Sequence, residues 1–297
     1  MDHPSLWKLM IEAWSALSEH YEPVVEQHCM EHRIDLKSWA LLLAVLSFEP
    51  EATTPGHLLV RVPYTAAEVY QERLENMRTR GNLDLEPHGG YKLTQRGREL
   101  TTHLIAIARE EMSRVDPLKP DESKRLAQIV GQLVKCSYNH TPPPDTWSIR
   151  LSSKLMPPLD PPLPCIEQGF SALAAYRDDA HLAAWNNSGL SATALETLTL
   201  LWRGEVASHD DLCRKLVNRG HGCHVHLDAI QDLRQSGYVS GPDYDLHVTP
   251  TGRLFRNRVE DLTDHYFFAP WNCLEGGERD EFESLLELLK KGLLVAA

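Results

Sequence analysis

The chain has 297 residues, of which 42% are hydrophobic and 24% are charged. This composition excludes a disordered chain, a collagen-like fibre and a long coiled coil, and it can supply ordinary buried cores, most naturally in two domains. No apolar run approaches the roughly 18 residues that a membrane-spanning helix requires.

The net charge of -12 is concentrated at the two ends of the chain. Residues 1–35 carry 7 acidic and 2 basic side chains, and residues 260–297 carry 9 and 3. The intervening segments are nearly neutral, with 10 bases and 10 acids over residues 36–115 and 8 of each over residues 190–259. The overall acidity therefore does not exclude DNA, because either middle segment can present a locally positive face.

The six cysteines are scattered and form no Cys-x-x-Cys pair. In a chain of this length, that spacing favours free thiols over a disulfide framework. The first residues show no signal-peptide pattern. We therefore expect a cytoplasmic protein with free thiols, and we interpret Cys29 and Cys273 as inert thiols, the alternative being a redox sensor.

The first half begins with a long amphipathic helix, expected over residues 5–33, and an apolar helix that starts at Leu36. A further helix has apolar residues at helical spacing and ends at Gly81, because glycine readily adopts the positive φ that follows many helices. Two short β-like stretches separated by a polar turn come next, which is the pattern of a small hairpin, or wing. Thr94 is a suitable N-cap for the helix expected over residues 95–115, and another helix is expected over 121–136.

Residues 138–165 contain eight of the 19 prolines. Proline disfavours the interior of both helices and sheets, so this segment is predicted to be a linker.

The second half shows the same order of signals. A helix is expected over residues 166–187, and a helix that ends at Gly237 precedes a second wing. Helices over 250–268 and 278–294 follow. Five residues of the first half recur in the second at offsets of 154 to 156 residues: Leu36 and Leu190, Gly81 and Gly237, Thr94 and Thr249, Gly97 and Gly252, and Arg98 and Arg253. This steady offset indicates an internal repeat.

The repeated segments resemble the MarR family of winged helix-turn-helix regulators. The matching stretches are RLENMRTRGNL with YKLTQRGREL in the first half, and AIQDLRQSGYV with LHVTPTGRLF in the second. The resemblance implies a mainly α fold with small β-wings, in which winged-helix domains at 1–137 and 166–297 flank the linker 138–165. Because MarR proteins act as homodimers, it also implies a dimer fused into one monomeric chain, with its outer helices packed together and both recognition helices pointing the same way.

The wings depart from the family pattern, in which arginines enter the minor groove. The first wing offers only His88 and Lys92, and the second offers Asp243, Asp245 and His247. The second wing is therefore expected to repel phosphate, because the narrow minor groove attracts cations.

Recognition helices contact base edges through their exposed N-terminal face, and nearby cations contact phosphates. The alternative is that such residues are merely solvent-facing or, in the second half, that they belong to a degenerate copy that only completes the fold. The residues predicted to contact DNA are Tyr64, Thr65, Glu68, Gln71, Arg73, Arg78, His88 and Lys92 in the first half, and Arg214, Lys215, Arg219, His221, His224 and Gln231 in the second.

Potential metal ligands are densest in the segment HGCHVH, which contains His221, Cys223, His224 and His226. On a helix the first and third of these share one face and the other two share another, so the segment alone cannot hold zinc tetrahedrally. We therefore expect no metal and no cofactor.

An enzyme is not expected, because the sequence lacks the common nucleotide-binding, metalloprotease and nucleophile motifs. The cluster Asp178, Asp179 and His181 is interpreted as a solvated helix face. Aromatic residues on the outer helices are expected to pack in the core, and the alternative is a pocket for a small aromatic or apolar effector. These residues are Trp7, Trp14, Tyr21, Trp185, Phe267, Phe268 and Trp271.

The sequence thus predicts a DNA-binding transcriptional regulator that uses two fused winged helix-turn-helix units on double-stranded DNA. The alternative is a tandem winged-helix module that binds protein or a small ligand and has lost DNA binding.

Overall fold

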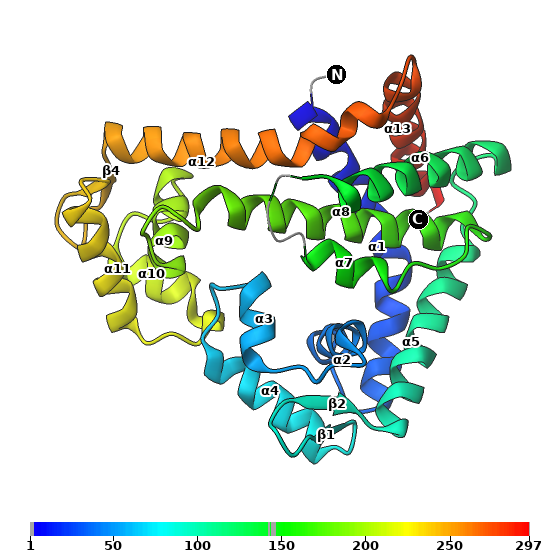
Figure 1. Cartoon of the computed structure of the whole chain (residues 1–297), viewed down its shortest axis with the longest axis horizontal. Coiled ribbons are helices and arrows are strands. Elements are labelled where there is room, and N and C mark those ends of the chain that lie inside the picture. The colour runs from blue at the N-terminus through cyan, green and yellow to red at the C-terminus, as the bar shows by residue number, and fades with distance from the viewer. Residues whose placement is uncertain (1–2, 142, 144–146, 297) are drawn as a thin grey trace. The chain divides into compact units, whose positions relative to one another are not determined.

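The computed structural model describes residues 3–141, 143 and 147–296, and within them the chain is mainly α-helical with two small antiparallel hairpins (Figure 1). The predicted fold class is therefore confirmed. Among the helices of these residues, each is either too short or too polar to span a lipid bilayer. In chain order the elements are α1 (His3–Glu31), α2 (Leu36–Phe48), α3 (Pro55–Arg61), α4 (Ala67–Thr79), β1 (Leu83–Leu85), β2 (Tyr91–Leu93), α5 (Gln95–Ser113), α6 (Pro120–Asn139), α7 (Trp147–Ser153), α8 (Pro162–Trp185), α9 (Ala192–Trp202), α10 (His209–Lys215), the 3-10 helix η1 (Val217–Arg219), α11 (Cys223–Gln235), β3 (Val239–Ser240), β4 (His247–Val248), α12 (Pro250–Phe268), the 3-10 helix η2 (Ala269–Cys273) and α13 (Glu278–Ala296).

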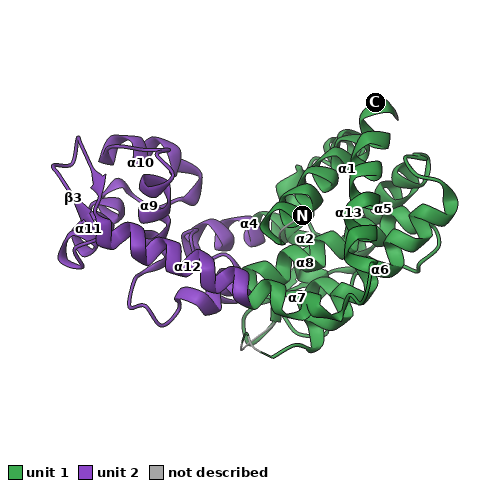
Figure 2. Cartoon of the chain, turned by 90° about the horizontal axis from the view of Figure 1, so that it is seen from above, with its two compact units in different colours: residues 1–53, 76–179, 266–297 green, residues 54–75, 180–265 purple. Residues whose placement is uncertain are grey.

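The chain packs into two compact units that do not follow the sequence halves (Figure 2). Unit 1 consists of residues 1–53, 76–179 and 266–297, and unit 2 consists of residues 54–75 and 180–265. The domain boundaries predicted from the repeat stay a prediction.

In unit 1, the N-terminal helix α1 packs against both α5 and the C-terminal helix α13. Lys290 of α13 forms an ion pair with Glu12 of α1 at 2.8 Å, and His20 lies 3.1 Å from the carbonyl oxygen of Leu293. These contacts hold the helices α1 and α13 against each other.

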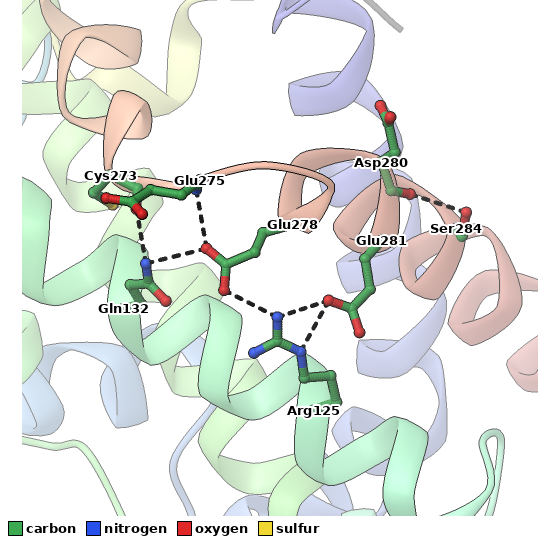
Figure 3. A network of polar contacts seen from close by, with 8 residues as sticks. All are labelled: Arg125, Gln132, Cys273, Glu275, Glu278, Asp280, Glu281 and Ser284. Carbon is green, nitrogen blue, oxygen red and sulfur yellow. Dashed lines mark hydrogen bonds and ion pairs between the residues drawn. The ribbon is translucent and has the colours of Figure 1, made fainter.

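Arg125 of α6 joins that helix to α13 through two carboxylates (Figure 3). Its guanidinium group lies 3.0 Å from Glu278 and 2.7 Å from Glu281. Gln132 lies about two helical turns further along the same face of α6. Its side-chain amide donates to the carbonyl oxygen of Cys273 at 2.8 Å. Arg125 lowers the pKa of both glutamates, because its charge favours their ionised form.

Part of the proline-rich segment is helical, which the sequence did not predict. The helix α7 lies inside residues 138–165, and its first amide groups are capped by Asp179 of α8. The Asp179 carboxylate is buried and accepts hydrogen bonds from the amides of Ser148 at 3.1 Å and Ile149 at 3.2 Å. The interpretation of Asp179 as part of a solvated helix face was therefore wrong. The start of α7 is buried, and its unpaired backbone amides need the Asp179 carboxylate as an acceptor.

Candidate nucleic-acid interface

The helices α2 and α3 in the first half and α9 and α10 in the second begin at capped residues in matching positions of the repeat. In each case a side-chain oxygen accepts the amide three residues later, which satisfies one of the unpaired donors of the first turn. The pairs are Asp35 with Ser38 (2.8 Å) and Thr54 with His57 (3.2 Å) in the first copy, and Ser191 with Ala194 (3.1 Å) and Ser208 with Asp211 (3.1 Å) in the second.

The corner between recognition helix and wing is built around two glycines and a threonine. In the first copy, Gly81 ends α4 with φ 76°, and the Thr94 hydroxyl donates to its carbonyl oxygen at 2.8 Å. Thr94 then accepts the amide of Gly97 at 2.9 Å as the N-cap of α5. A Cβ atom on Gly97 would overlap the carbonyl oxygen of Asn82, so only glycine fits there.

The second copy has the same corner. Gly237 follows α11 with φ 71°, and Thr249 donates to its carbonyl oxygen at 2.6 Å. Thr249 accepts the amide of Gly252 at 3.0 Å, and a Cβ atom on Gly252 would overlap the carbonyl oxygen of Tyr238. Three of the five recurring pairs, Gly81 and Gly237, Thr94 and Thr249, and Gly97 and Gly252, therefore make the same contacts in both halves.

Each wing is also paired with the loop before the helix-turn-helix. Thr53 exchanges two backbone hydrogen bonds with Tyr91, at 2.8 and 2.7 Å. In the second copy, the amide of Leu246 donates to the carbonyl oxygen of Ala207 at 2.8 Å. Each two-stranded wing is thus hydrogen-bonded to the loop before α3 or before α10.

In the second copy, α11 buries an apolar stripe of Ala229, Ile230 and Leu233 against α9 and α10. Its first-turn residue His224 and its middle residue Gln231 are exposed. This is the expected arrangement of a recognition helix, with its polar face directed away from the core.

A disulfide joins the two helices of this helix-turn-helix. It links Cys213 of α10 to Cys223 at the start of α11, whose Cα atoms are 5.4 Å apart. His209 lies beside it, with Nε2 3.4 Å from the Cys213 sulfur and 2.9 Å from the Cys223 carbonyl oxygen. The expectation of free thiols throughout the chain was therefore wrong for this pair, because the fold brings together two cysteines whose spacing carries no disulfide signature.

Reduction of this disulfide is expected to destabilise unit 2 by about 2–3 kcal/mol, because the cross-link closes a loop with a sequence separation of 10 residues in the unfolded chain. Thermal unfolding with and without a reductant measures the effect. A variant with both cysteines replaced by serine is the control and should not respond to the reductant. Equal responses of the wild type and this variant would contradict the prediction.

The free cysteines Cys29 and Cys273 fit the interpretation as inert thiols. Burial raises the pKa of Cys29 to about 11. Burial together with the neighbouring Cys136 thiol raises that of Cys273 to about 12. A thiol with so high a pKa carries little of the reactive thiolate at neutral pH.

The cations predicted to meet phosphate in the second copy have acidic neighbours. Arg214 pairs with Asp211, and Lys215 lies 2.7 Å from Glu205. Arg234 lies 2.8 Å from Asp243 and so joins α11 to the wing. Arg214 and Lys215 remain exposed, so a phosphate group can compete for both.

Four other predicted residues meet one another instead of lying separately on two recognition surfaces. His221 Nε2 is 3.1 Å from the carbonyl oxygen of Tyr64, and the Arg219 guanidinium is 3.4 Å from the hydroxyl of Thr65 and 5.7 Å from the centre of the Tyr64 ring. The Thr65 side chain is buried, at 6% exposure. In this conformation it does not face solvent.

Glu196 of α9 fixes the position of Arg219. One of its carboxylate oxygens lies 2.7 Å from Arg219 Nη2 and accepts from Nε at 2.9 Å. Burial raises the pKa of Glu196, and the charge of Arg219 opposes that rise. Sequence reasoning missed Glu196, because it is one acidic residue on an otherwise apolar helix and its partner is 23 residues away.

The remaining predicted residues of the first copy lie on the outer side of α4 and on its wing. Glu68, Gln71 and Arg78 are exposed, and Arg73 is half-buried. On the wing, His88 is exposed, while Lys92 lies 3.4 Å from Glu86.

The segment HGCHVH does not form a metal centre. His226 is buried against the core, where burial lowers its pKa, and Cys223 is in the disulfide. Within the part of the chain that the structure describes, no cluster of three or more His, Cys, Asp or Glu side chains is arranged to hold a metal ion.

The second half of the chain resembles a known protein family. Residues 157–296 match the model of a helix-turn-helix family. No curated protein and no solved structure matches the chain. The match confirms a helix-turn-helix domain in the second half, and such domains are typical of DNA-binding regulators.

Proposed function

We propose that this protein is a sequence-specific transcriptional regulator that binds double-stranded DNA through two fused winged helix-turn-helix units of the MarR type. The observation that carries the proposal is the repeated corner of glycine, threonine and glycine, at Gly81, Thr94 and Gly97 and again at Gly237, Thr249 and Gly252. The same contacts orient a helix and a wing in both halves, which supports two DNA-binding units on one chain. We call each helix-turn-helix segment with its wing a head. A chain with two heads is suited to a pseudo-palindromic or asymmetric site.

The DNA contacts are proposed for the exposed polar residues of each head. In the second head these are His224 and Gln231 for base edges, with Arg214 and Lys215 for phosphates. In the first head they are Glu68 and Gln71, with Arg73, Arg78, His88 and Lys92 as the flanking groups.

A small-molecule effector is part of the proposal, and Glu167 of α8 supports it. This carboxylate accepts hydrogen bonds from Trp14 Nε1 at 3.2 Å and from the Tyr21 hydroxyl at 3.1 Å. It keeps partial access to solvent, yet desolvation by the surrounding protein raises its pKa. A carboxyl group held between aromatic donors suits an aromatic ligand with a hydrogen-bond donor.

The second candidate is a tandem winged-helix module that binds a protein or a small ligand and no longer binds DNA. The acidic second wing favours it, because Arg234 lies 2.8 Å from Asp243 and His247 lies 3.1 Å from Asp245, so both basic side chains at this wing already face carboxylates.

Selection of duplexes from a random-sequence pool, followed by titration at several salt concentrations, tests the proposal. A DNA-binding regulator should enrich one duplex sequence from the pool. Its affinity should fall steeply between 50 and 200 mM salt: in a plot of log affinity against log salt concentration, each neutralised phosphate contributes a slope of about -0.9. Arg73→Ala or Arg78→Ala should weaken binding to all duplexes and reduce the salt slope by about 1.

Arg114→Ala is the control, because Arg114 is an exposed arginine at the end of α5 that pairs with Glu110 and Glu111. This variant should bind DNA like the wild type. No enriched sequence together with flat salt dependence would favour the second candidate.

A further inference from the structure

The residues directly before α4 contact the turn that precedes α11. The amide of Ala66 donates to the carbonyl oxygen of Arg219 at 2.8 Å, and His221 contacts the carbonyl oxygen of Tyr64. We call the contact of residues 64–69 with residues 219–221 the turn contact. It lies entirely within unit 2.

Gly220 is the residue that makes this approach possible. It has φ 76°, and a Cβ atom there would overlap Cγ2 of Val69. The next-nearest atoms to that added Cβ would be the Cβ atoms of Ala66 and Val69, at the ordinary contact distances of 3.6 and 3.7 Å. A side chain at position 220 therefore fits the turn contact only if Val69 shifts, and it is strained by the positive φ as well.

The turn contact covers the residues directly before α4, at the end of the helix that would approach DNA, while Glu68 and Gln71 remain exposed. Recognition helices enter the major groove with their N-terminal residues against base edges. Here Thr65 and Ala66 are buried, at 6% and 7% exposure, and Arg219 and His221 of the other head are held against the same turn. While the contact is formed, residues 219–221 occupy the N-terminal end of α4, and this end cannot enter a major groove.

We propose that the turn contact is autoinhibitory: it holds the two heads in a closed form, and reading DNA requires it to open. This inference rests on the proposed function. A protein whose binding-competent form is only a minor fraction binds its ligand more weakly by that same fraction. Minor states are commonly populated at roughly 0.1–10%, so opening the contact should tighten DNA binding about 10-fold or more.

Gly220→Ala tests the proposal, because the added methyl group forces Val69 to shift and strains the backbone at φ 76°, and both effects weaken the turn contact. Gly189→Ala is the matched control: it introduces the same strain at φ 79° in unit 2, outside the corner of recognition helix and wing, and no heavy atom lies within 4 Å of its added Cβ. Val69→Ala in the Gly220→Ala background removes the overlapping methyl group and should allow the contact to form again.

Two measurements are made on the full chain. Hydrogen exchange at the Ala66 amide reports whether the turn contact is formed, and titration of a 30-base-pair mixed-sequence duplex at 50 mM salt reports the affinity for DNA. Gly220→Ala should speed the exchange and tighten binding about 10-fold, Gly189→Ala should change neither, and the double variant should restore both. His221→Ala, which adds no atom, serves as a milder opening variant if Gly220→Ala fails to fold.

The outcomes separate this inference from the proposed function. Faster exchange at Ala66 with unchanged or weaker DNA binding overturns autoinhibition and leaves DNA binding intact. If neither the wild type nor any opened variant binds a duplex, the proposed function and the inference both fail.

Discussion

Replacing Gly252 with alanine is expected to lower the free energy of unfolding of unit 2 by about 2–3 kcal/mol. The new Cβ atom would overlap the backbone carbonyl oxygen of Tyr238, which cannot rotate away as a side chain can. That oxygen also accepts hydrogen bonds from the amide and, at 3.3 Å, from the hydroxyl of Thr249. The start of α12 must therefore separate from the wing. Denaturant unfolding of the full chain measures the change.

Gly97→Ala should have a similar cost in unit 1, because its Cβ atom would overlap the carbonyl oxygen of Asn82. Gly131→Ala in α6 is the control. It has no heavy atom within 4 Å of the added Cβ, and alanine favours a helix over glycine by up to about 1 kcal/mol. If Gly97 and Gly252 tolerate alanine as well as Gly131 does, the corner does not require glycine.

The helices were predictable where their signals are local. The expected helix 250–268 agrees with α12 at both ends, and the helix expected over 95–115 ends two residues later than α5. Apolar spacing and an N-cap threonine lie within the segment itself in both cases, so no distant residue is needed to recognise them.

The helix α7 was missed for the opposite reason. Prolines dominate the composition around it, and the group that caps it, Asp179, lies 31 residues from Ser148 along the chain. Local propensity cannot reveal a cap that only the packed structure supplies. The disulfide between Cys213 and Cys223 was also missed because it depends on the folded structure: the turn between α10 and α11 brings the two sulfur atoms together.

The candidate site was only partly predictable. The spacing of apolar residues along the sequence predicts which faces of α4 and α11 are polar. It correctly places His224 and Gln231 on an exposed face. It cannot show that Thr65 is buried, because the covering residue, Arg219, is 154 residues away. Glycine at position 220 indicates a turn, but its contact with Val69 arises only from the packing of one head against the other.

Phe267→Ala is expected to destabilise unit 1 by about 3–5 kcal/mol. Phe267 is fully buried, and its ring lies 4.7 Å from that of Trp7, 6.0 Å from that of Tyr176 and 5.4 Å from that of Trp271. Because these rings come from α1, α8 and η2, the cavity would loosen three elements at once, and rigid helices cannot fully close around it.

Phe267→Leu is the matched variant, since it keeps an apolar side chain but loses the edge-to-face ring contacts, and it should cost about 1.5 kcal/mol or less. The Arg177 guanidinium, 5.2 Å from the Phe267 ring centre, loses a cation–π partner in both variants, so the difference between them isolates the cavity. Unfolding monitored by tryptophan fluorescence gives both values, with Trp7 and Trp271 as reporters within the cluster. Equal stability of the two variants would mean that helix packing closes the space, and that the aromatic cluster does not hold the outer helices together.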